Sequence, residues 1–203
     1  MPTPTLFRKL GLYVDEAFLD PSLCQRLRQN LQVSRSAAGR ITVEGDKTAV
    51  DETIRRVDRV GLEGAPEEEV RKRLLDRMPA LAEHFQVDLG GCQGPEFLRY
   101  RVGSFYKGHV DNGASHPVSA GRRVSAVVFL NRQSKEPQEQ AFGGGSLVFY
   151  GLMKGEQFQK IGLPVDATEG LLVAFPSEVF HEVQPVTHGE RMTVVNWFTA
   201  KDL

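Results

Sequence analysis

The chain has 203 residues, a hydrophobic share of 40% and a charged share of 25%, values that are ordinary for a soluble globular protein. Its formal net charge of -1 gives no general attraction for nucleic acid or for an anionic membrane. No apolar run approaches the roughly 20 residues that a membrane-spanning helix needs. We therefore expect neither nucleic acid nor a membrane among its partners.

The N-terminal stretch MPTPTLFRKLGLYVDEAF lacks the apolar core and the small-residue cleavage site of a secretion signal. Cys24 and Cys92 are the only cysteines. Cys24 falls in a helical pattern and Cys92 in a glycine-rich turn, so we expect two reduced thiols rather than a disulfide. These features predict a cytoplasmic protein.

Two helices are expected before residue 88. The first begins at Asp20 and Pro21, residues suited to a cap and a first helical position, and an apolar stripe follows at Leu23, Leu27 and Leu31. The second begins at Pro66 with three glutamates that favour the positive end of the helix dipole. Its apolar stripe runs to Phe85, and Pro79 is expected to kink or divide it.

The segment between these helices, residues 35–60, is polar, charged and punctuated by glycine. We interpret it as a loop or hairpin. It contains a small basic cluster, Arg55, Arg56 and Arg59. A solvated surface explains such a cluster, but the segment could also be a substrate-facing lid that folds over an active site and excludes water.

After residue 94 the pattern changes to short strands separated by turn signals. The expected strands are Glu96–Val102, Arg123–Leu130, Ser146–Tyr150, Gly170–Phe175, Phe180–Gln184 and Arg191–Thr199. Arg123–Leu130 is apolar on both faces, as expected for a sheet with helices behind it and a core in front. The triplet Gly143–Gly145 lacks the Lys-Ser/Thr of a phosphate loop and predicts a tight turn. The fold class is mainly β with helical support (α+β), a jelly roll supported by N-terminal helices.

A His-x-Asp pair, His109 and Asp111, is the first chemical signal. In an extended chain, residues two apart point to one face, so one metal could bind both. A second histidine, His181, follows seventy residues later in a β-type segment. Two histidines and one carboxylate that leave other positions open form the ligand set of non-haem Fe(II) sites that activate O2. A closed structural zinc site would normally use four ligands.

Arg191 strengthens this interpretation. It begins an apolar strand in which Arg191, Thr193 and Trp197 share one face. An arginine that points into a barrel needs a carboxylate partner, and its planar fork suits bidentate binding of a carboxylic acid. The alternative partner is an internal aspartate or glutamate.

These motifs resemble a known family. The stretches LRYRVGSFYKGHVDN, RRVSAVVFLN, FGGGSLVFYG, FHEVQP and RMTVVNWF are similar, in order and spacing, to the 2-oxoglutarate/Fe(II) dioxygenases, in particular the branch of the prolyl 4-hydroxylases and hypoxia-factor prolyl hydroxylases. The resemblance implies a double-stranded β-helix and a single catalytic domain over residues 1–203. Residues 91–203 would form the catalytic jelly roll, and residues 1–90 the helical support and substrate loop.

The resemblance also implies roles for individual residues. His109, Asp111 and His181 would hold iron, and Arg191 would bind the far carboxylate of 2-oxoglutarate with help from Thr193. Tyr100 matches a family tyrosine that reaches this cosubstrate, and Trp197 matches an aromatic residue that lines the iron pocket. Arg122 falls at a position near the substrate in the hypoxia-factor branch. Tyr106 would either line the mouth of the pocket or pack in the core.

One position departs from the family. Phe129 stands where the hypoxia-factor branch has a tyrosine that hydrogen-bonds the cosubstrate, and a phenylalanine cannot donate that bond. The cosubstrate carboxylate must then depend on Arg191 and another donor. The implied cofactors are Fe(II), 2-oxoglutarate and O2, with ascorbate as a candidate reductant.

The remaining histidines predict no catalytic role. His84 is expected at the surface of the second helix, His116 in a solvated loop that could lie near the substrate, and His188 in a turn beside Gly189. The resemblance implies hydroxylation of a prolyl residue in a peptide or protein, with release of succinate and CO2. The alternatives are hydroxylation of a free amino acid or small amino-acid-derived metabolite, and a non-catalytic jelly-roll binding module.

Overall fold

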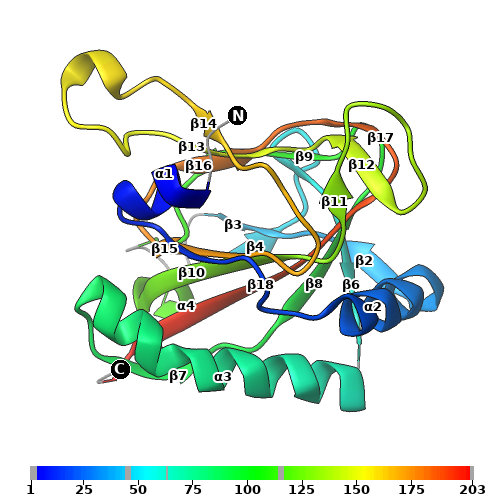
Figure 1. The fold of residues 1–203 in the computed structure, drawn as a ribbon, viewed down its shortest axis with the longest axis horizontal. Helices are drawn as coiled ribbons and strands as arrows, with labels where there is room; N and C mark the ends of the chain where they lie inside the picture. Colours follow the sequence, from blue (N-terminus) through cyan, green and yellow to red (C-terminus); the bar gives the residue numbers. More distant parts are fainter. Residues whose placement is uncertain (1–3, 44–46, 63, 114–116, 202–203) are drawn as a thin grey trace.

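A computed structural model describes residues 4–43, 47–62, 64–113 and 117–201 (Figure 1). Its largest sheet has the strand order β1-β15-β10-β18-β8-β6-β2, with β7 also paired to β18. These strands are β1 (Tyr13–Asp15), β2 (Ser36–Ala38), β6 (Asp58–Val60), β7 (Leu89–Cys92), β8 (Glu96–Tyr100), β10 (Arg122–Phe129), β15 (Leu172–Pro176) and β18 (Arg191–Ala200). Neighbouring strands of this sheet pair in antiparallel orientation.

A second sheet faces the first and has the order β14-β13-β16-β9-β5. Its strands are β5 (Arg55–Arg56), β9 (Phe105–His109), β13 (Leu147–Phe149), β14 (Leu163–Pro164) and β16 (His181–Val183). Smaller sheets are formed by β11 (Arg132–Gln133), β12 (Ala141–Gly144) and β17 (Val186–His188), and by the hairpin of β3 (Ile41–Val43) and β4 (Lys47–Ala49). The two facing sheets confirm the predicted jelly-roll class.

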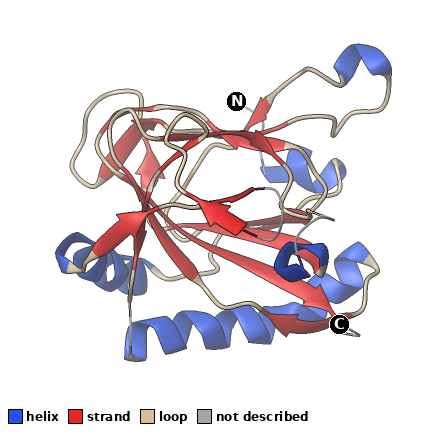
Figure 2. Cartoon of the chain, turned by 180° about the vertical axis from the view of Figure 1, so that it is seen from behind, coloured by secondary structure: helices blue, strands red, loops and turns tan. Residues whose placement is uncertain are grey.

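The predicted helices are present as α2 (Pro21–Val33) and α3 (Ala65–Phe85), and both pack on the large sheet (Figures 1 and 2). The remaining helical elements are short: α1 (Pro4–Lys9), α4 (Pro117–Ala120) and the 3₁₀ turn η1 (Glu156–Phe158). In the described part of the chain, no helix combines the length and apolar character needed to cross a membrane.

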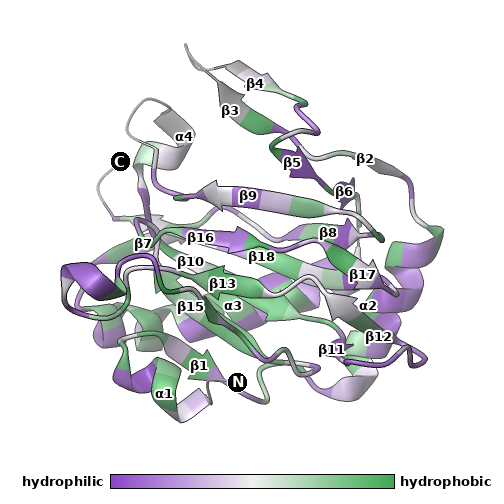
Figure 3. Ribbon diagram, turned by 90° about the horizontal axis from the view of Figure 1, so that it is seen from above, coloured by the Kyte–Doolittle hydropathy of each residue, from purple (hydrophilic) through white to green (hydrophobic). Residues whose placement is uncertain are grey.

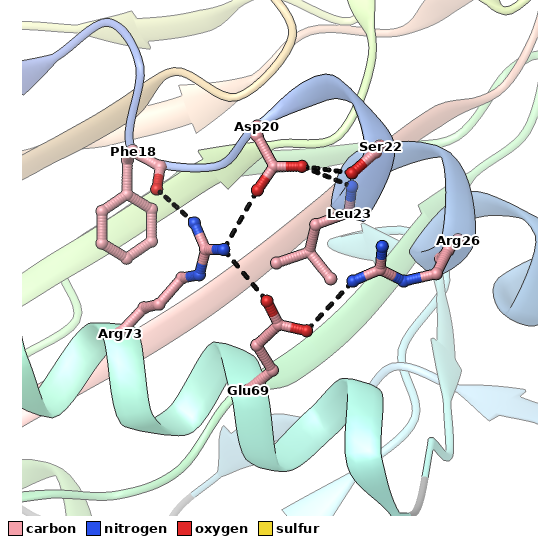
Figure 4. Close-up of polar contacts among 7 residues, drawn as sticks. All are labelled: Phe18, Asp20, Ser22, Leu23, Arg26, Glu69 and Arg73. Atoms are coloured by element: carbon pink, nitrogen blue, oxygen red, sulfur yellow. Dashed lines mark hydrogen bonds and ion pairs between the residues drawn. The ribbon is translucent and has the colours of Figure 1, made fainter.

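The start of α2 is fixed as the sequence predicts. The Asp20 carboxylate accepts hydrogen bonds from the Leu23 backbone N–H and from the Ser22 hydroxyl. Its other oxygen accepts from Arg73 of α3, which also binds Glu69 on its own helix (Figure 4). This network ties the two supporting helices together through the cap.

Two expectations about the N-terminal third need correction. Helix α3 is not divided at Pro79, because Leu74 and Leu81 on either side of it are buried in the same core. Residues 35–60 are not simply a loop, since they supply β2 and β6 to the large sheet and β5 to the second sheet. The hairpin interpretation holds for β3 and β4, which extend from the body of the molecule in Figure 3.

Two hydrophobic cores lie on opposite sides of the large sheet. One joins the sheet to α2 and α3, with Leu27, Leu74 and Phe198 among its members. The other fills the space between the two sheets and includes Phe129 and Phe149. Alternation along β10 and β18 divides their side chains between these cores. Strand β18 therefore presents Arg191, Thr193 and Trp197 to the space between the sheets, where the functional residues gather.

Candidate active site

Strand pairing brings the two predicted histidines together. Strands β9 and β16 are antiparallel, and their register places His109 opposite His181. No strand was predicted over Phe105–His109, so this pairing was not anticipated. Asp111 follows in a turn whose backbone N–H groups at Asp111 and Asn112 donate to the Ser177 carbonyl at 2.8 and 3.0 Å. The turn aims the carboxylate back toward the imidazoles.

The three side chains converge on one point. One ligand atom from each of His109, Asp111 and His181 lies within 4.8 Å of the other two. Nε2 of His109 is 3.6 Å from Oδ1 of Asp111, and Nε2 of His181 is 3.7 Å from Oδ2. Two imidazoles and one carboxylate that face a common point can hold a divalent ion and leave other coordination positions open.

Backbone carbonyls fix the orientation of both imidazoles. Nδ1 of His109 contacts the Lys107 carbonyl, and Nδ1 of His181 contacts the Val179 carbonyl, each at 2.9 Å. A carbonyl only accepts, so each Nδ1 must carry the hydrogen. The lone pair of each Nε2 is then free to face a metal.

Burial and local charge set the protonation of these ligands. Burial together with the neighbouring His109 lowers the pKa of His181 to about 4, so His181 is neutral near pH 7. Burial alone would raise the pKa of Asp111, but its interactions with His109 and His181 outweigh that effect and hold the pKa well below its usual range. A neutral imidazole and an ionised carboxylate are the forms that bind a metal ion.

Arg191 lies fully inside the space between the sheets, with 1% of its surface exposed. Its Nη1 donates to Thr193 Oγ1 at 3.2 Å, and its Nε has no hydrogen-bond partner. The guanidinium carbon lies 4.9 Å from the ring centre of Tyr100 and 5.1 Å from that of Phe129. Burial lowers its pKa to about 10, which still leaves it charged near pH 7.

No carboxylate of the described residues forms an ion pair with Arg191. The internal acid that the sequence left open as a partner is therefore missing from the described part of the chain. Gly145 makes room for this side chain: its φ is +56°, and a Cβ there would come within 3.1 Å of Arg191 Cδ. The triplet is not the tight turn that the sequence predicts: Gly143 and Gly144 end strand β12, and Gly145 lies in the short connection to β13.

Most of the predicted site residues line one cavity. Around it lie His109, Asp111, His181, Arg191, Tyr100, Tyr106 and Trp197, together with Arg55 and apolar residues such as Leu98, Leu147 and Val183. Tyr106 stacks on His109 with ring centres 3.6 Å apart. Thr193 reaches the site through its contact with Arg191.

A second, outer chamber shares Arg55, Tyr106, Asp111 and Trp197 with this cavity. Its further lining includes Arg40, Ile41, Thr48, Arg59, Glu96, Ser119 and Arg122. Arg122 lies over Trp197, with its guanidinium carbon 3.7 Å from the ring centre. The outer chamber therefore connects the 35–60 segment to the cavity. Arg40 and Glu96 were not predicted to lie here, because long-range strand pairing brings them together.

Two further histidines, His84 and His188, lie away from the cavity. His84 is exposed on α3 and contacts the Gly11 carbonyl at 3.2 Å. His188 ends β17 opposite Gly143 and does not line the cavity. His116 falls outside the described residues. Cys24 and Cys92 are free thiols, as predicted.

Two facing β-sheets enclose two histidines, one carboxylate and a buried arginine without a carboxylate partner among the described residues. This arrangement defines the class of non-haem iron oxygenases that use a carboxylic acid cosubstrate. The family model described as the 2OG-Fe(II) oxygenase superfamily matches residues 95–199, which is more than half of the chain. The chain belongs to this superfamily, and it is an Fe(II)/2-oxoglutarate-dependent dioxygenase. This assignment is contrary to the alternative of a non-catalytic binding module.

Relatives and solved structures agree with this assignment. A PKHD-type hydroxylase from Nitrobacter winogradskyi is 29% identical over 189 residues, which cover 88% of this chain and 74% of the relative. A Pseudomonas putida prolyl-4-hydroxylase structure has a TM-score of 0.69 at 25% identity and covers 93% of this chain and 92% of its own. A Trichoplax adhaerens prolyl hydroxylase in complex with a hypoxia-inducible-factor peptide fragment shares the fold, with a TM-score of 0.71, 19% identity and coverage of 97% and 87%.

The residues present fit the cofactors that this family uses. The histidine and carboxylate donors suit Fe(II), and both imidazoles expose Nε2 toward the same point. The Arg191 guanidinium, which has no carboxylate partner among the described residues, suits the binding of a 2-oxoglutarate carboxylate. Both features face one cavity.

Proposed function

We propose that this enzyme hydroxylates a prolyl residue in a peptide or protein, consuming O2 and 2-oxoglutarate and releasing succinate and CO2. The observation that carries the proposal is the unpaired, buried Arg191 in the same cavity as His109, Asp111 and His181. The substrate class is supported by the prolyl-4-hydroxylase from Pseudomonas putida, which is similar over nearly the whole chain.

In this proposal His109, Asp111 and His181 hold Fe(II). Fe(II), 2-oxoglutarate and O2 together supply the oxidation that inserts one oxygen atom into an unactivated C–H bond. The chain contributes orientation, because the Lys107 and Val179 carbonyls fix both imidazole rings. It also excludes water, since the aromatic and aliphatic residues around the cavity leave little polar surface beside the ligands.

Arg191 binds the far carboxylate of 2-oxoglutarate, and Thr193 assists it. Phe129 contributes a ring face near the guanidinium but no hydrogen bond. Thr193 Oγ1, which already contacts Arg191 Nη1, is therefore the second donor that we assign to this carboxylate. Tyr100 lines the same end of the cavity and completes the cosubstrate site.

Trp197, Tyr106 and Arg122 form the side that meets the substrate. Trp197 and Tyr106 line both the cavity and the outer chamber, so a peptide in that chamber would reach the metal side of the site. We propose that residues 35–60 act as a lid, because Arg40, Ile41 and Thr48 line the same chamber. We also propose that residues 1–203 act as one cytoplasmic catalytic domain; the shared core of helices and large sheet and the two free thiols support this.

The test is product analysis. The purified enzyme with Fe(II), 2-oxoglutarate and air should add one oxygen atom to proline in a proline-containing peptide library and form succinate in equal amount. Mass spectrometry detects both products. Oxygen incorporation into free amino acids alone, with no peptide oxidised, would favour the metabolite alternative and contradict the prolyl proposal.

A further inference from the structure

Among the described residues that line it, the outer chamber carries more positive than negative charge. Four arginines line it, Arg40, Arg55, Arg59 and Arg122, against the two acids Glu96 and Asp111. Arg59 pairs with Glu96 at 2.8 Å, and Asp111 belongs to the proposed metal site. Among the described residues, Arg40, Arg55 and Arg122 form no ion pair with a carboxylate. The chamber therefore holds cations that the described protein does not neutralise.

Arg55 is held in place without its charge being paired. Strand β5 pairs with β9 so that Arg55 lies opposite Tyr106, and its guanidinium carbon is 4.7 Å from that ring centre. Nη1 donates to the Arg40 carbonyl at 2.7 Å, whereas the buried Nε has no hydrogen-bond partner. Only 8% of the residue is exposed. A cation this buried gains from an anionic ligand, because burial removes most of its hydration.

Arg122 reaches the chamber from the large sheet. Its Nε donates to Gln93 Oε1 at 2.9 Å, and its guanidinium carbon lies over the Trp197 ring. Nη1 lies 3.4 Å from the backbone carbonyl of Asp111, beside the proposed metal site. Stacking on Trp197 and the hydrogen bond to Gln93 orient the planar fork before any ligand arrives.

We propose that the substrate presents an acidic side chain immediately next to the target proline, and that Arg55 and Arg122 bind this carboxylate. This inference rests on the proposed function, which supplies the prolyl residue. Two guanidiniums stacked on aromatic rings bind a carboxylate with little loss of conformational freedom. They lie in the chamber that shares Tyr106, Asp111 and Trp197 with the catalytic cavity. Figure 3 shows the strongly hydrophilic β5 at the base of the β3–β4 hairpin.

The first arm of the test uses the unmodified enzyme and three matched peptides, in which the residues flanking one proline are glutamate, glutamine or lysine. The glutamate peptide should have a kcat/KM at least about 10-fold above the glutamine peptide, as expected for a charge-assisted hydrogen bond. The lysine peptide should react most slowly. Equal kcat/KM values for all three would overturn the inference.

The second arm uses variants with a matched control on the same strand. Arg55→Gln and Arg122→Gln should remove the preference for glutamate over glutamine. Arg56→Gln should keep it, because Arg56 lies beside Arg55 on β5, pairs with Glu52 and lines neither chamber. A raised KM for 2-oxoglutarate in Arg55→Gln and Arg122→Gln, with the peptide preference intact, would assign these arginines to the cosubstrate and contradict the inference.

The outcomes separate this inference from the proposed function. If prolines are oxidised in all peptides without regard to charge, the proposed prolyl hydroxylation is retained and only the preference for an acidic neighbour is refuted. Failure to oxidise any peptide removes the proposed function itself. If free proline alone is oxidised, and if this activity depends on Arg55 and Arg122, the two arginines bind the carboxylate of the free amino acid. That result would overturn the assignment of a peptide substrate.

Discussion

The two faces of strand β18 carry side chains of different polarity. Toward helices α2 and α3 it presents Met192, Val194 and Phe198, which are buried in an apolar core. Toward the second sheet it presents Arg191 and Thr193, which are equally buried and polar. The first face lowers the free energy of the folded state by removing apolar surface from water. The second face raises the free energy of the folded state, because it removes an unpaired cation from water.

This difference separates the parts of the molecule that hold the fold from the parts that perform the chemistry. Changes on the helix side should lower stability and leave the intrinsic rate of the folded enzyme intact. Changes between the sheets should alter activity, and some of them should raise stability. The following changes test that division, from the largest expected effect to the smallest.

Asp111→Ala should have the largest effect on activity. It removes the only carboxylate of the proposed metal site. Mutation of a residue that only hydrogen-bonds to a metal ligand typically lowers activity roughly 10–100-fold. Loss of the ligand itself should lower turnover by much more. Succinate formation measures it, and thermal unfolding should show that the fold is retained. Turnover within a few fold of the unmodified enzyme would contradict the assignment of Asp111.

Phe198→Ala should have the largest effect on stability. Phe198 is fully buried on the helix side of β18. Its truncation should lower the free energy of unfolding by about 3–5 kcal/mol, the usual cost of such a cavity. Urea denaturation measures this loss. The kcat of the remaining folded enzyme should stay within about twofold, and a collapse of kcat without a loss of stability would break the comparison.

Arg191→Met should raise the stability of the ligand-free protein and weaken the binding of 2-oxoglutarate. Replacing a buried, unpaired cation by an apolar side chain of similar length should stabilise the ligand-free protein by about 1–4 kcal/mol. Loss of the carboxylate contact should raise the KM for 2-oxoglutarate by roughly 100-fold. Denaturation and steady-state kinetics test the two effects, and an unchanged KM would assign the carboxylate to another residue.

His181 should make the stability of the metal-free protein depend on pH. Burial and His109 lower its pKa from 6.5 to about 4 in the folded state. Between these values the unfolded chain binds more protons at His181, so folding stability falls as the pH decreases from about 6.5 to about 4. Chelator-treated His181→Gln should show a shallower decrease. Identical pH profiles for the two proteins in urea denaturation would contradict this.

Much of this site could be predicted from the sequence because local chemistry marks it. The alternation that directs Arg191 inward follows from strand geometry alone. His109 and Asp111 were predicted to share one face of an extended chain, but β9 ends at His109 and a turn brings Asp111 to the site. The family resemblance supplied the expected partners Tyr100, Thr193 and Trp197. The structure brings these residues together around one cavity, and their roles remain predictions.

Long-range contacts could not be predicted in the same way. The pairing of β5 with β9, which places Arg55 over Tyr106, joins residues about fifty positions apart, and no local pattern specifies it. The sequence also left open whether Pro79 kinks or divides α3, and the helix is not divided because the burial of Leu74 and Leu81 in the core outweighs a local helix-breaking preference. Tertiary packing decided both cases.

The central claim is that one cavity holds Fe(II) on His109, Asp111 and His181 and 2-oxoglutarate on Arg191. Anaerobic addition of Fe(II) and 2-oxoglutarate tests it most directly, through the weak visible charge-transfer absorption of the chelate. The unmodified enzyme should develop this band, Asp111→Ala should lack it, and Arg191→Met should need far more 2-oxoglutarate to form it. A normal band at normal 2-oxoglutarate concentration in both variants would contradict the account.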